Sequence, residues 1–369
     1  MPRVVIVLPV FNHETYLEHA IGSLYAQDYS DFQIAAVDDG SQDGSLDMLN
    51  RHGRRLLVIE SAHRGPAAAR NAAIQATDSE LVAFMDADDL CRPQRLRLEI
   101  ERLESEKRDL VASALDFIDA HGRPLPGLWR CPAGASNDYW GALLERNWIG
   151  TPSVLVRRDV FYRTGLFDET FTHAEDYDLW LRIGQEHSIG YVDTALVQCR
   201  RHPTNTSKNA SSHQRFERLA LQKVEPAKAH AAFHRLYPDG RRQAEAWIWF
   251  LLRRGDPAFR REICCAIQQY PESPALRFAV GVFQYDCGEF EYAMKTFDSI
   301  KNRDVCALHN LGVIQARCGD PASAELQIRE ALRRRSDYHD ARYNLAALQS
   351  GRQLRLTRRT LRQDPLPLV

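Results

Sequence analysis

The amino-terminal part of the chain alternates between short, wholly apolar runs and longer amphipathic patterns. The apolar runs predict strands at Val4–Leu8, Ile34–Val37, Leu56–Ile59 and Leu81–Met85. Helical periodicity predicts helices between them, at Glu14–Gln27, Leu46–His52 and Pro66–Ala76. A strand that is apolar on both faces is typical of a parallel sheet covered by helices on both sides. The pattern extends to about Val197 and predicts a doubly wound, mostly parallel α/β sheet with right-handed crossovers.

A different pattern begins at about Gln243, where strand signals end and helical periodicity repeats. Small residues recur 31 residues apart, in the pairs Gly281 and Gly312, Gly288 and Gly319, and Ala293 and Ala324. Such spacing is typical of tetratricopeptide-like repeats, in which paired helices cross closely. We therefore expect about three repeats of this class over residues 243–350, with a generic helical bundle as the alternative. Stacked repeats form a concave surface that binds a peptide, a protein partner or a second copy of the chain.

Length and charge limit the classes of protein that this chain can belong to. A chain of 369 residues is comfortable for two domains. Lys and Arg number 48 and Asp and Glu number 49, which gives no reason to expect a nucleic-acid partner. Basic charge gathers instead in the tail over residues 351–369, which carries no acid before Asp364. Such a tail is either a solvated terminus or a segment that contacts anionic lipid.

Cysteine usage and hydropathy bear on the cellular compartment. The 8 cysteines include no Cys-x-x-Cys pair, so zinc spacing is absent and a reducing cytoplasm is expected. No window reaches the roughly 18 apolar residues of a membrane-spanning helix. The run Val4–Leu8 is too short for a signal sequence. We expect a cytoplasmic protein, with peripheral attachment to the inner face of the membrane as an open alternative.

Two acidic residues follow the last of the predicted strands, at the end where α/β sheets bind ligands. The triplet Asp86-Ala87-Asp88 comes directly after Leu81–Met85. Carboxylates in this position suit Mg²⁺ or Mn²⁺ shared with a diphosphate. The ion would neutralise the charge on a departing nucleoside diphosphate. The alternative is that the triplet only caps the helix predicted over Arg92–Glu106.

Three further loops follow the other predicted strands. Asp39 lies in the turn after the second strand, where a carboxylate can accept hydrogen bonds from a nucleobase or a ribose. Pro9, Phe11 and Asn12 follow the first strand, and the Phe11 ring could stack on a base. Arg70, after the third strand, has a planar guanidinium that pairs with nucleotide oxygens. Taken singly, Asp39 has a simple turn, Phe11 a core position and Arg70 a surface helix position as the alternative.

Together and in this order, the motifs resemble the nucleotide-binding half of family 2 glycosyltransferases, which have the GT-A fold. The residues that carry the resemblance are Val4–Asn12, Gln27, Val37–Ser41, Ala69–Asn71 and Asp86–Asp89. The resemblance implies that Asp86 binds the ribose and that Asp88 binds a metal ion, Mn²⁺ or Mg²⁺. It also implies a nucleotide site in which the base is read by Asp39 and lined by Pro9, Phe11, Asn12 and Arg70.

The resemblance continues to about residue 208. The pair Glu175-Asp176 resembles the Glu-Asp motif of the family, which implies that Asp176 is the general base. In a single inverting displacement, a carboxylate must take the proton of the acceptor hydroxyl. A simple helix N-cap is the alternative for Asp176. His202 lies in a run similar to one in the family that implies a third metal ligand or a diphosphate contact, and an imidazole favours Mn²⁺ over Mg²⁺.

These patterns predict a particular domain organisation. It comprises a GT-A glycosyltransferase domain at residues 1–210, a helical connector at 211–242, tetratricopeptide-like repeats at 243–350 and a basic tail at 351–369. Within the first domain, Phe117–Asn147 predicts an irregular loop on the acceptor side. The expected donor is a nucleotide sugar, UDP-linked by resemblance, with GDP- and dTDP-sugars left open. The expected acceptor is a hydroxyl of a glycan, a lipid-linked sugar or a protein or peptide.

Two rival functions stay open. The first is an inactive transferase-like platform whose repeats bind a protein partner. Three converging carboxylates at Asp86, Asp88 and Asp176 speak against it, because their mutual repulsion is costly without a cation. The second is a sugar nucleotidyltransferase, which would need a glycine-rich basic loop where this chain has Asn12, His13 and Glu14. The Gln-x-x-Arg-Trp motif of processive synthases does not occur, which favours the addition of one or a few sugars.

Overall fold

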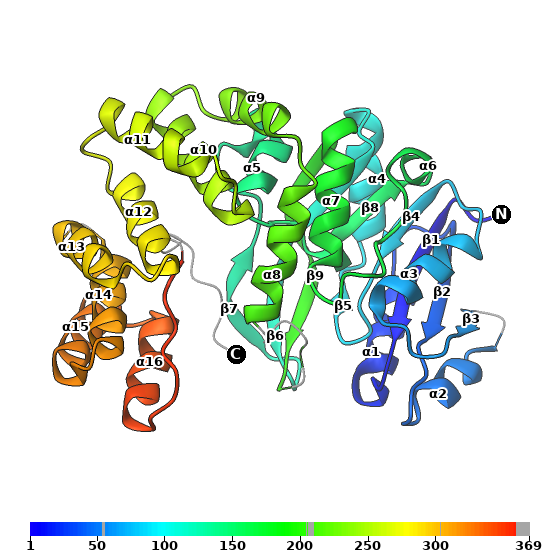
Figure 1. Ribbon diagram of the computed structural model, residues 1–369. Coiled ribbons are helices and arrows are strands. Elements are labelled where there is room, and N and C mark those ends of the chain that lie inside the picture. Colours follow the sequence, from blue (N-terminus) through cyan, green and yellow to red (C-terminus); the bar gives the residue numbers. More distant parts are fainter. Residues whose placement is uncertain (54–55, 204, 206–209, 303, 359–369) are drawn as a thin grey trace. The chain divides into compact units, whose positions relative to one another are not determined.

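The chain divides into two compact units, Met1–Leu236 and Tyr237–Leu368. The computed structural model describes residues 1–53, 56–203, 205, 210–302 and 304–358 (Figure 1). The first unit is built around one sheet, and the second consists of helices. The division at residues 236 and 237 leaves most of the segment predicted as a connector inside the first unit.

The amino-terminal half of the sheet has the predicted parallel arrangement. Strands β1 (Val4–Val10), β2 (Phe32–Asp38), β3 (Leu56–Glu60) and β4 (Leu81–Phe84) lie in the order β3-β2-β1-β4, and each neighbouring pair is parallel. Their residues are almost wholly buried in β1 and β4. The carboxyl ends of these strands therefore meet at one edge, where the predicted motifs lie.

The other half makes the sheet mixed. Strand β8 (Val154–Arg157) pairs antiparallel with both β4 and β6 (Leu110–Asp119). Strand β9 (Ile189–Arg201) then pairs parallel with β6 and antiparallel with the short β5 (Leu90–Cys91). The predicted doubly wound sheet is thus present, with antiparallel pairs added beyond β4.

Helices cover both faces of this sheet, and they are the predicted ones. Helices α1 (Glu14–Tyr25) and α4 (Arg95–Ser105) pack their apolar residues against one face, in a core shared with β1. Helix α2 (Ser45–Arg51) follows β2, and α3 (Pro66–Gln75) contacts β1 and β2. Phe84 of β4 packs in an aromatic cluster with Phe167 and Trp180. The ring centroids of the three residues lie 5.4 to 6.0 Å apart.

The segment Phe117–Asn147 is not irregular, so that prediction was wrong. Strand β6 runs on to Asp119, β7 (Pro124–Trp129) pairs with it, and α5 (Tyr139–Glu145) follows. The two prolines of β7 obscured the strand, but among the described strands β7 pairs with β6 alone and so lies at an edge, where proline is tolerated. The Trp129 indole donates a hydrogen bond to the Trp148 carbonyl at 2.7 Å, which joins β7 to the residues that follow α5.

Two helices close the first unit. Helix α8 (Ala210–Gln222) and α9 (Pro226–Leu236) follow β9, and α9 packs against α5. A Cβ built on Gly141 of α5 would lie 3.2 Å from the Ala232 carbonyl oxygen. The two helices therefore approach closely through a glycine, which places α9 firmly in the first unit.

The second unit contains the predicted helical region as successive helix pairs (Figure 1). Its helices are α10 (Gly240–Arg254), α11 (Phe259–Gln269), α12 (Pro274–Asp286), α13 (Phe290–Ile300), α14 (Val305–Arg317), α15 (Pro321–Arg334) and α16 (His339–Gln349). Helices α12 and α13 pair, as do α14 and α15, and they share one apolar core. The assignment of these pairs to the tetratricopeptide class stays a prediction.

The recurring glycines have two distinct physical roles. A Cβ on Gly281 would lie 2.7 Å from the Phe297 ring, and one on Gly312 would lie 2.9 Å from the Ala324 carbonyl oxygen. These two glycines allow the paired helices to touch. Gly288 and Gly319 instead have φ values of 78° and 91°, in the left-handed region that turns the chain between the helices of a pair.

We expect Gly312→Ala to destabilise the second unit by about 1–3 kcal/mol, because the added methyl overpacks the α14–α15 contact. Urea unfolding followed by circular dichroism measures the change. The matched control is Gly240→Ala, where the methyl meets the hydroxyl end of the Tyr270 side chain, which can move aside, and not a backbone atom. Equal stability of the two variants would contradict the close packing.

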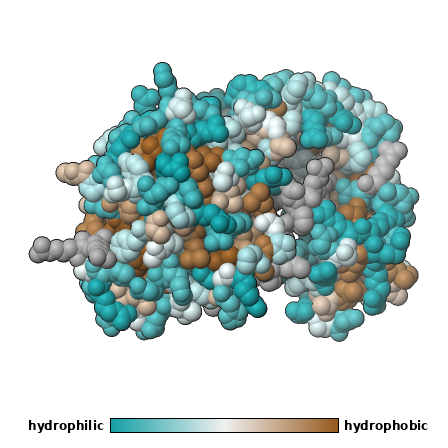
Figure 2. Space-filling model, turned by 180° about the vertical axis from the view of Figure 1, so that it is seen from behind, coloured by the Kyte–Doolittle hydropathy of each residue, from teal (hydrophilic) through white to brown (hydrophobic). Residues whose placement is uncertain are grey.

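The surface of one face is largely hydrophilic, with hydrophobic residues visible as separate areas (Figure 2). Large apolar side chains that are exposed are scattered along the chain, at Met1, Phe11, Leu57, Tyr162, Leu219, Tyr292 and Leu326. Among the described residues, none of the helices combines the length and the apolar character that crossing a membrane requires.

Candidate active site

The loop after β4 brings a carboxylate into contact with a histidine that follows β9. The Asp88 Oδ2 atom lies 2.8 Å from Nε2 of His202, which directly follows β9. Asn205 also donates to Asp88 Oδ2, at 3.3 Å. The Arg200 Nε donates to the Asp88 carbonyl at 2.7 Å and holds the loop to β9. The two predicted metal ligands therefore lie in contact.

Arg70 bridges two acids from different loops. Its Nη2 donates to Asp86 Oδ1 at 3.0 Å, and its Nη1 donates to Glu175 Oε1 at 2.9 Å. Burial lowers the pKa of Arg70, but the charges of Asp86 and Glu175 outweigh it and the pKa is raised. Burial raises the pKa of Asp86 despite the opposing charge of Arg70. The side chain of Arg70 is only 6% exposed, so a surface helix position was the wrong alternative.

Asp176 lies in the first turn of α7 (Glu175–Glu186). Its Oδ2 accepts a hydrogen bond from the Thr151 hydroxyl at 3.0 Å, and its Oδ1 accepts from the Tyr177 backbone N–H at 2.6 Å. Burial raises the pKa of Asp176, and the neighbouring charge of Glu175 adds to the rise. Ala174, the residue directly before α7, has a left-handed backbone with φ 56°, which is strained for a residue with a Cβ. The carboxylate is thus held in a fixed orientation with raised basicity.

Asp39 is buried, with 3% of its surface exposed. Its Oδ1 accepts from the Arg64 backbone N–H at 2.8 Å and from the Ser61 hydroxyl at 2.9 Å. Its Oδ2 accepts from the Gly65 N–H at 2.7 Å. These three donors make Asp39 the anchor of the loop that leads into α3. A contact with a base would have to use the remaining acceptor capacity of this carboxylate.

Phe11 and Asn12 directly follow β1, and Pro9 lies within it. The Phe11 ring is 36% exposed and stacks on the His63 ring at a centroid distance of 4.0 Å. A core position for Phe11 was therefore the wrong alternative. Asn12 has a left-handed φ of 56°, and its N–H donates to the Ser41 hydroxyl at 3.0 Å. Pro9 is half-buried within β1.

The donor set at Asp88 and His202 suits a divalent cation of the Mn²⁺ type, since it offers a carboxylate oxygen and an imidazole nitrogen. Within the described residues, no group of three or more His, Cys, Asp and Glu side chains could hold a metal ion. The chain would thus supply two ligands. This number fits ions that keep water and bind substrate phosphates as their remaining ligands.

Residues 5–171 match the model of glycosyl transferase family 2. The first unit therefore carries a family 2 glycosyltransferase domain. Both Asp86 and Asp88 fall inside the match, whereas Asp176 and His202 lie beyond its end.

Proteins similar to the glycosyltransferase domain are also named as glycosyltransferases. An uncharacterized glycosyltransferase of Rickettsia bellii is 28% identical over 218 residues, which are 58% of this chain and 32% of the relative. The Escherichia coli protein WfgD, a UDP-Glc:alpha-D-GlcNAc-diphosphoundecaprenol beta-1,3-glucosyltransferase, is 24% identical over 219 residues, which are 59% of this chain and 82% of WfgD. The match spans about a third of the length of several of the Rickettsia relatives.

Solved structures of TarS from S. aureus share the fold. TarS superposes with a TM-score of 0.51 at 18% identity, over 87% of this chain and 54% of TarS. The TarS fragment 1–349 in complex with UDP gives a TM-score of 0.50 at 17% identity, over 91% of this chain and 93% of the fragment. The predicted GT-A fold of the glycosyltransferase domain is thereby confirmed.

Sequence reasoning missed several residues that shape this site. Glu175 pairs with Arg70, Thr151 donates to Asp176, and His63 stacks on Phe11. The signal for Glu175 was present, since it directly precedes Asp176 in the Glu-Asp motif. No pattern marked His63 or Thr151 for these contacts, because their partners are distant in sequence.

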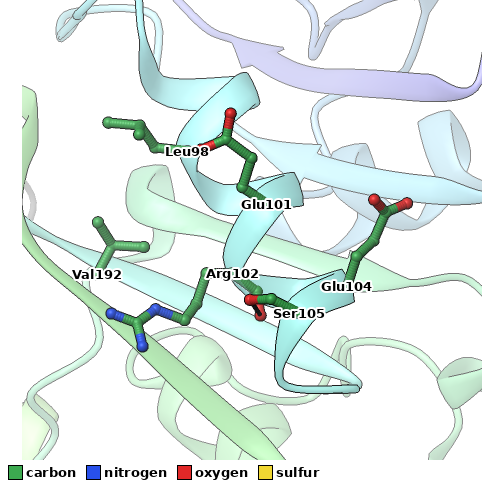
Figure 3. Close-up of a pocket in the computed structure, with 6 residues that line it drawn as sticks. All are labelled: Leu98, Glu101, Arg102, Glu104, Ser105 and Val192. Atoms are coloured by element: carbon green, nitrogen blue, oxygen red, sulfur yellow. Dashed lines mark hydrogen bonds between the residues drawn. The ribbon is translucent and has the colours of Figure 1, made fainter.

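A separate surface depression lies on the glycosyltransferase domain, away from these residues. It is lined by residues of α4 and β9, namely Leu98, Glu101, Arg102, Glu104, Ser105 and Val192 (Figure 3). None of the predicted site residues is among them. We assign this depression no part in the chemistry.

Proposed function

We propose that the chain is an inverting glycosyltransferase that moves a sugar from a UDP-sugar to a hydroxyl, with a divalent cation bound by Asp88 and His202. One observation carries the proposal: Asp88 and His202 lie 2.8 Å apart at the carboxyl end of β4, two residues from Asp86. This is the edge of an α/β sheet at which ligands bind.

The choice of donor rests on relatives. WfgD takes UDP-Glc by its name, and the TarS fragment has been solved with UDP. Arg70 adds support from this chain, because its Nε is buried and has no hydrogen-bond partner among the described residues. A buried donor of this kind is costly to leave unpaired. An oxygen of the bound nucleotide would satisfy it, while Asp86 binds the ribose.

The proposed reaction uses Asp176 as the base. The acceptor oxygen forms a bond to the anomeric carbon, the bond from that carbon to the diphosphate breaks, and its electron pair leaves with UDP. The proton of the acceptor hydroxyl goes to Asp176. When bound, the cation would neutralise negative charge that develops on the diphosphate. The raised pKa of Asp176 makes this carboxylate a stronger base than an exposed one.

The acceptor in this proposal is a hydroxyl of a glycan, a lipid-linked sugar or a peptide. In this proposal the glycosyltransferase domain supplies the donor site and the base. For the second unit, the proposal is that its helical pairs bind a protein partner or a second copy of the chain.

The test is release of UDP from UDP-sugars with added Mn²⁺ or Mg²⁺. We expect Asp88→Ala to fall below about 1% of the wild-type rate, because a catalytic metal ion supplies several kcal/mol. Excess chelator should have the same effect on the wild type. Asp47→Ala, at an exposed position of α2, is the matched control and should keep full activity. Full activity in excess chelator would contradict the proposed metal role.

A further inference from the structure

The carboxyl-terminal segment Arg352–Arg358 lies along the helices of the second unit as an extended chain (Figure 1). It follows α16 through Gly351, whose φ is 66°. A freely solvated tail is therefore the wrong expectation for these residues. The rest of the predicted tail, residues 359–369, lies outside the described residues.

Two asparagines hold the main chain of this segment. The Asn310 Nδ2 donates to the Thr357 carbonyl at 2.8 Å, and its Oδ1 accepts from the Thr357 N–H at 2.9 Å. Asn344 makes the same pair with Arg355, at 2.7 Å and 2.8 Å. Each amide thus imitates the paired hydrogen bonds that a neighbouring β-strand makes with an extended chain. Such recognition reads the backbone and not the side chain.

The two asparagines occupy equivalent places on successive first helices. Asn310 lies on α14 and Asn344 on α16, each followed by a leucine and a small residue. Both are fully buried. In an extended chain, residues i and i+2 face the same side, which is why Arg355 and Thr357 meet the two amides. The spacing of the helices therefore matches the repeat of an extended peptide.

A chain of buried hydrogen bonds continues from these amides to the Thr357 side chain. Asn344 donates to His309 Nε2 at 2.7 Å, and the Tyr338 hydroxyl lies 3.1 Å from His309 Nδ1. Burial lowers the pKa of His309 to about 4, so the ring is neutral and Nε2 can accept. The Tyr338 and Thr357 hydroxyls are 2.5 Å apart, and Thr357 donates to Asp340 at 2.5 Å. The groove thus recognises a hydroxyl at this position of the peptide.

Basic side chains of the segment also have partners. Arg358 forms two hydrogen bonds with Asp286, at 2.6 and 2.7 Å. The Arg355 guanidinium lies over the Tyr343 ring, 3.8 Å from its centroid. The groove therefore favours arginine at both ends of a four-residue core, with the hydroxyl residue at the third position.

We propose that this groove of α12, α14 and α16 is a binding site for an extended basic peptide of the pattern Arg-x-Thr/Ser-Arg, and that the segment Arg352–Arg358 occupies it in cis. A peptide in trans must compete with a tethered occupant, whose effective concentration is of the order of millimolar. Removal of the tether therefore opens the site to a separate peptide.

The test measures binding of a fluorescent peptide with the sequence of residues 352–358 by anisotropy. We expect a chain that ends at Gly351 to bind it at least about 100-fold more tightly than the full chain does, because tethering contributes 10²–10⁴-fold. Asn310→Ala in the shortened chain should abolish binding. N-methylation of the peptide nitrogen at Thr357 should do the same, whereas N-methylation at Leu356 is the matched control.

Two binding results would overturn the proposal. One is no binding by a shortened chain that keeps its helical circular dichroism. The other is binding that N-methylation at Thr357 leaves unchanged. If the shortened chain does not fold, hydrogen exchange in the full chain decides. The amides of Arg355 and Thr357 should exchange faster in Asn310→Ala while those of α13 stay protected, and equal exchange would overturn the proposal.

Discussion

Asp176→Asn is expected to lower kcat about 10²–10⁴-fold, the usual contribution of a general base, while the Kd for the nucleotide sugar stays unchanged. The amide keeps the size of the carboxylate but cannot take the acceptor proton. Thr151 and Tyr177 already fix the orientation of this side chain, so the substitution changes its basicity more than its position. UDP release measures turnover, and calorimetric titration measures binding.

Thr151→Val serves as the graded companion to this variant. It removes the hydroxyl that donates to Asp176 at 3.0 Å and keeps the branched shape. A lost hydrogen bond to the charged form raises the pKa of a carboxylate. The acidic limb of the kcat profile should therefore move to higher pH, with KM unchanged. Loss of nucleotide binding in Asp176→Asn would instead make Asp176 a ligand or a structural residue.

Arg95→Met is expected to destabilise the first unit by about 3–5 kcal/mol, because it leaves a buried carboxylate without its partner. Arg95 and Glu99 are both fully buried, with Nε 3.2 Å from each Glu99 oxygen. Ser113 donates to Glu99 at 2.8 Å, and Arg95 also donates to the Val154 carbonyl at 3.1 Å. Urea midpoints at pH 8, above the raised pKa of Glu99 of about 7, measure the loss. The double variant with Glu99→Leu should recover most of it, and failure to recover would contradict the ion-pair explanation.

The same pair gives the stability of the first unit a pH dependence. Burial raises the pKa of Glu99 from 4.5 to about 7, against the lowering effect of Arg95. The folded state therefore holds this proton more tightly than the unfolded state. Its stabilising contribution is complete below pH 4.5 and is lost as the pH rises through about 7. Glu99→Gln should flatten this part of the curve, measured as urea midpoints at pH 5 and pH 8, and an equal slope in both proteins would contradict it.

The sequence predicted the first half of the sheet well because buried parallel strands are continuous apolar runs. The strands at Val4, Phe32, Leu56 and Leu81 begin within two residues of their expected places. The second half depends on pairing between β6 and β9, whose partners such as Leu110 and Ile189 are far apart in the chain. No local pattern encodes that register, and the prolines of β7 argued against a strand.

Some residues of the candidate site could likewise be predicted from the sequence, and others could not. Asp86 and Asp88 were predicted from a strand-end triplet, and the structure brings His202 to Asp88 as the resemblance implied. The bridge from Arg70 to Glu175 could not be predicted, since 105 residues separate the two. Asp39 illustrates the limit of a motif, because its carboxylate accepts hydrogen bonds from Ser61, Arg64 and Gly65, and no sequence pattern predicted these contacts. Its role in reading a base stays a prediction.

The contact between Asp88 and His202 also orders events during synthesis of the protein. The ribosome adds 114 residues between the two. At about 5–20 residues per second, the nascent chain carries an incomplete site for on the order of 10 s. The four parallel strands can pair in that interval, since all of them precede residue 85. A nascent chain therefore contains all four parallel strands before it contains His202, the residue that contacts Asp88.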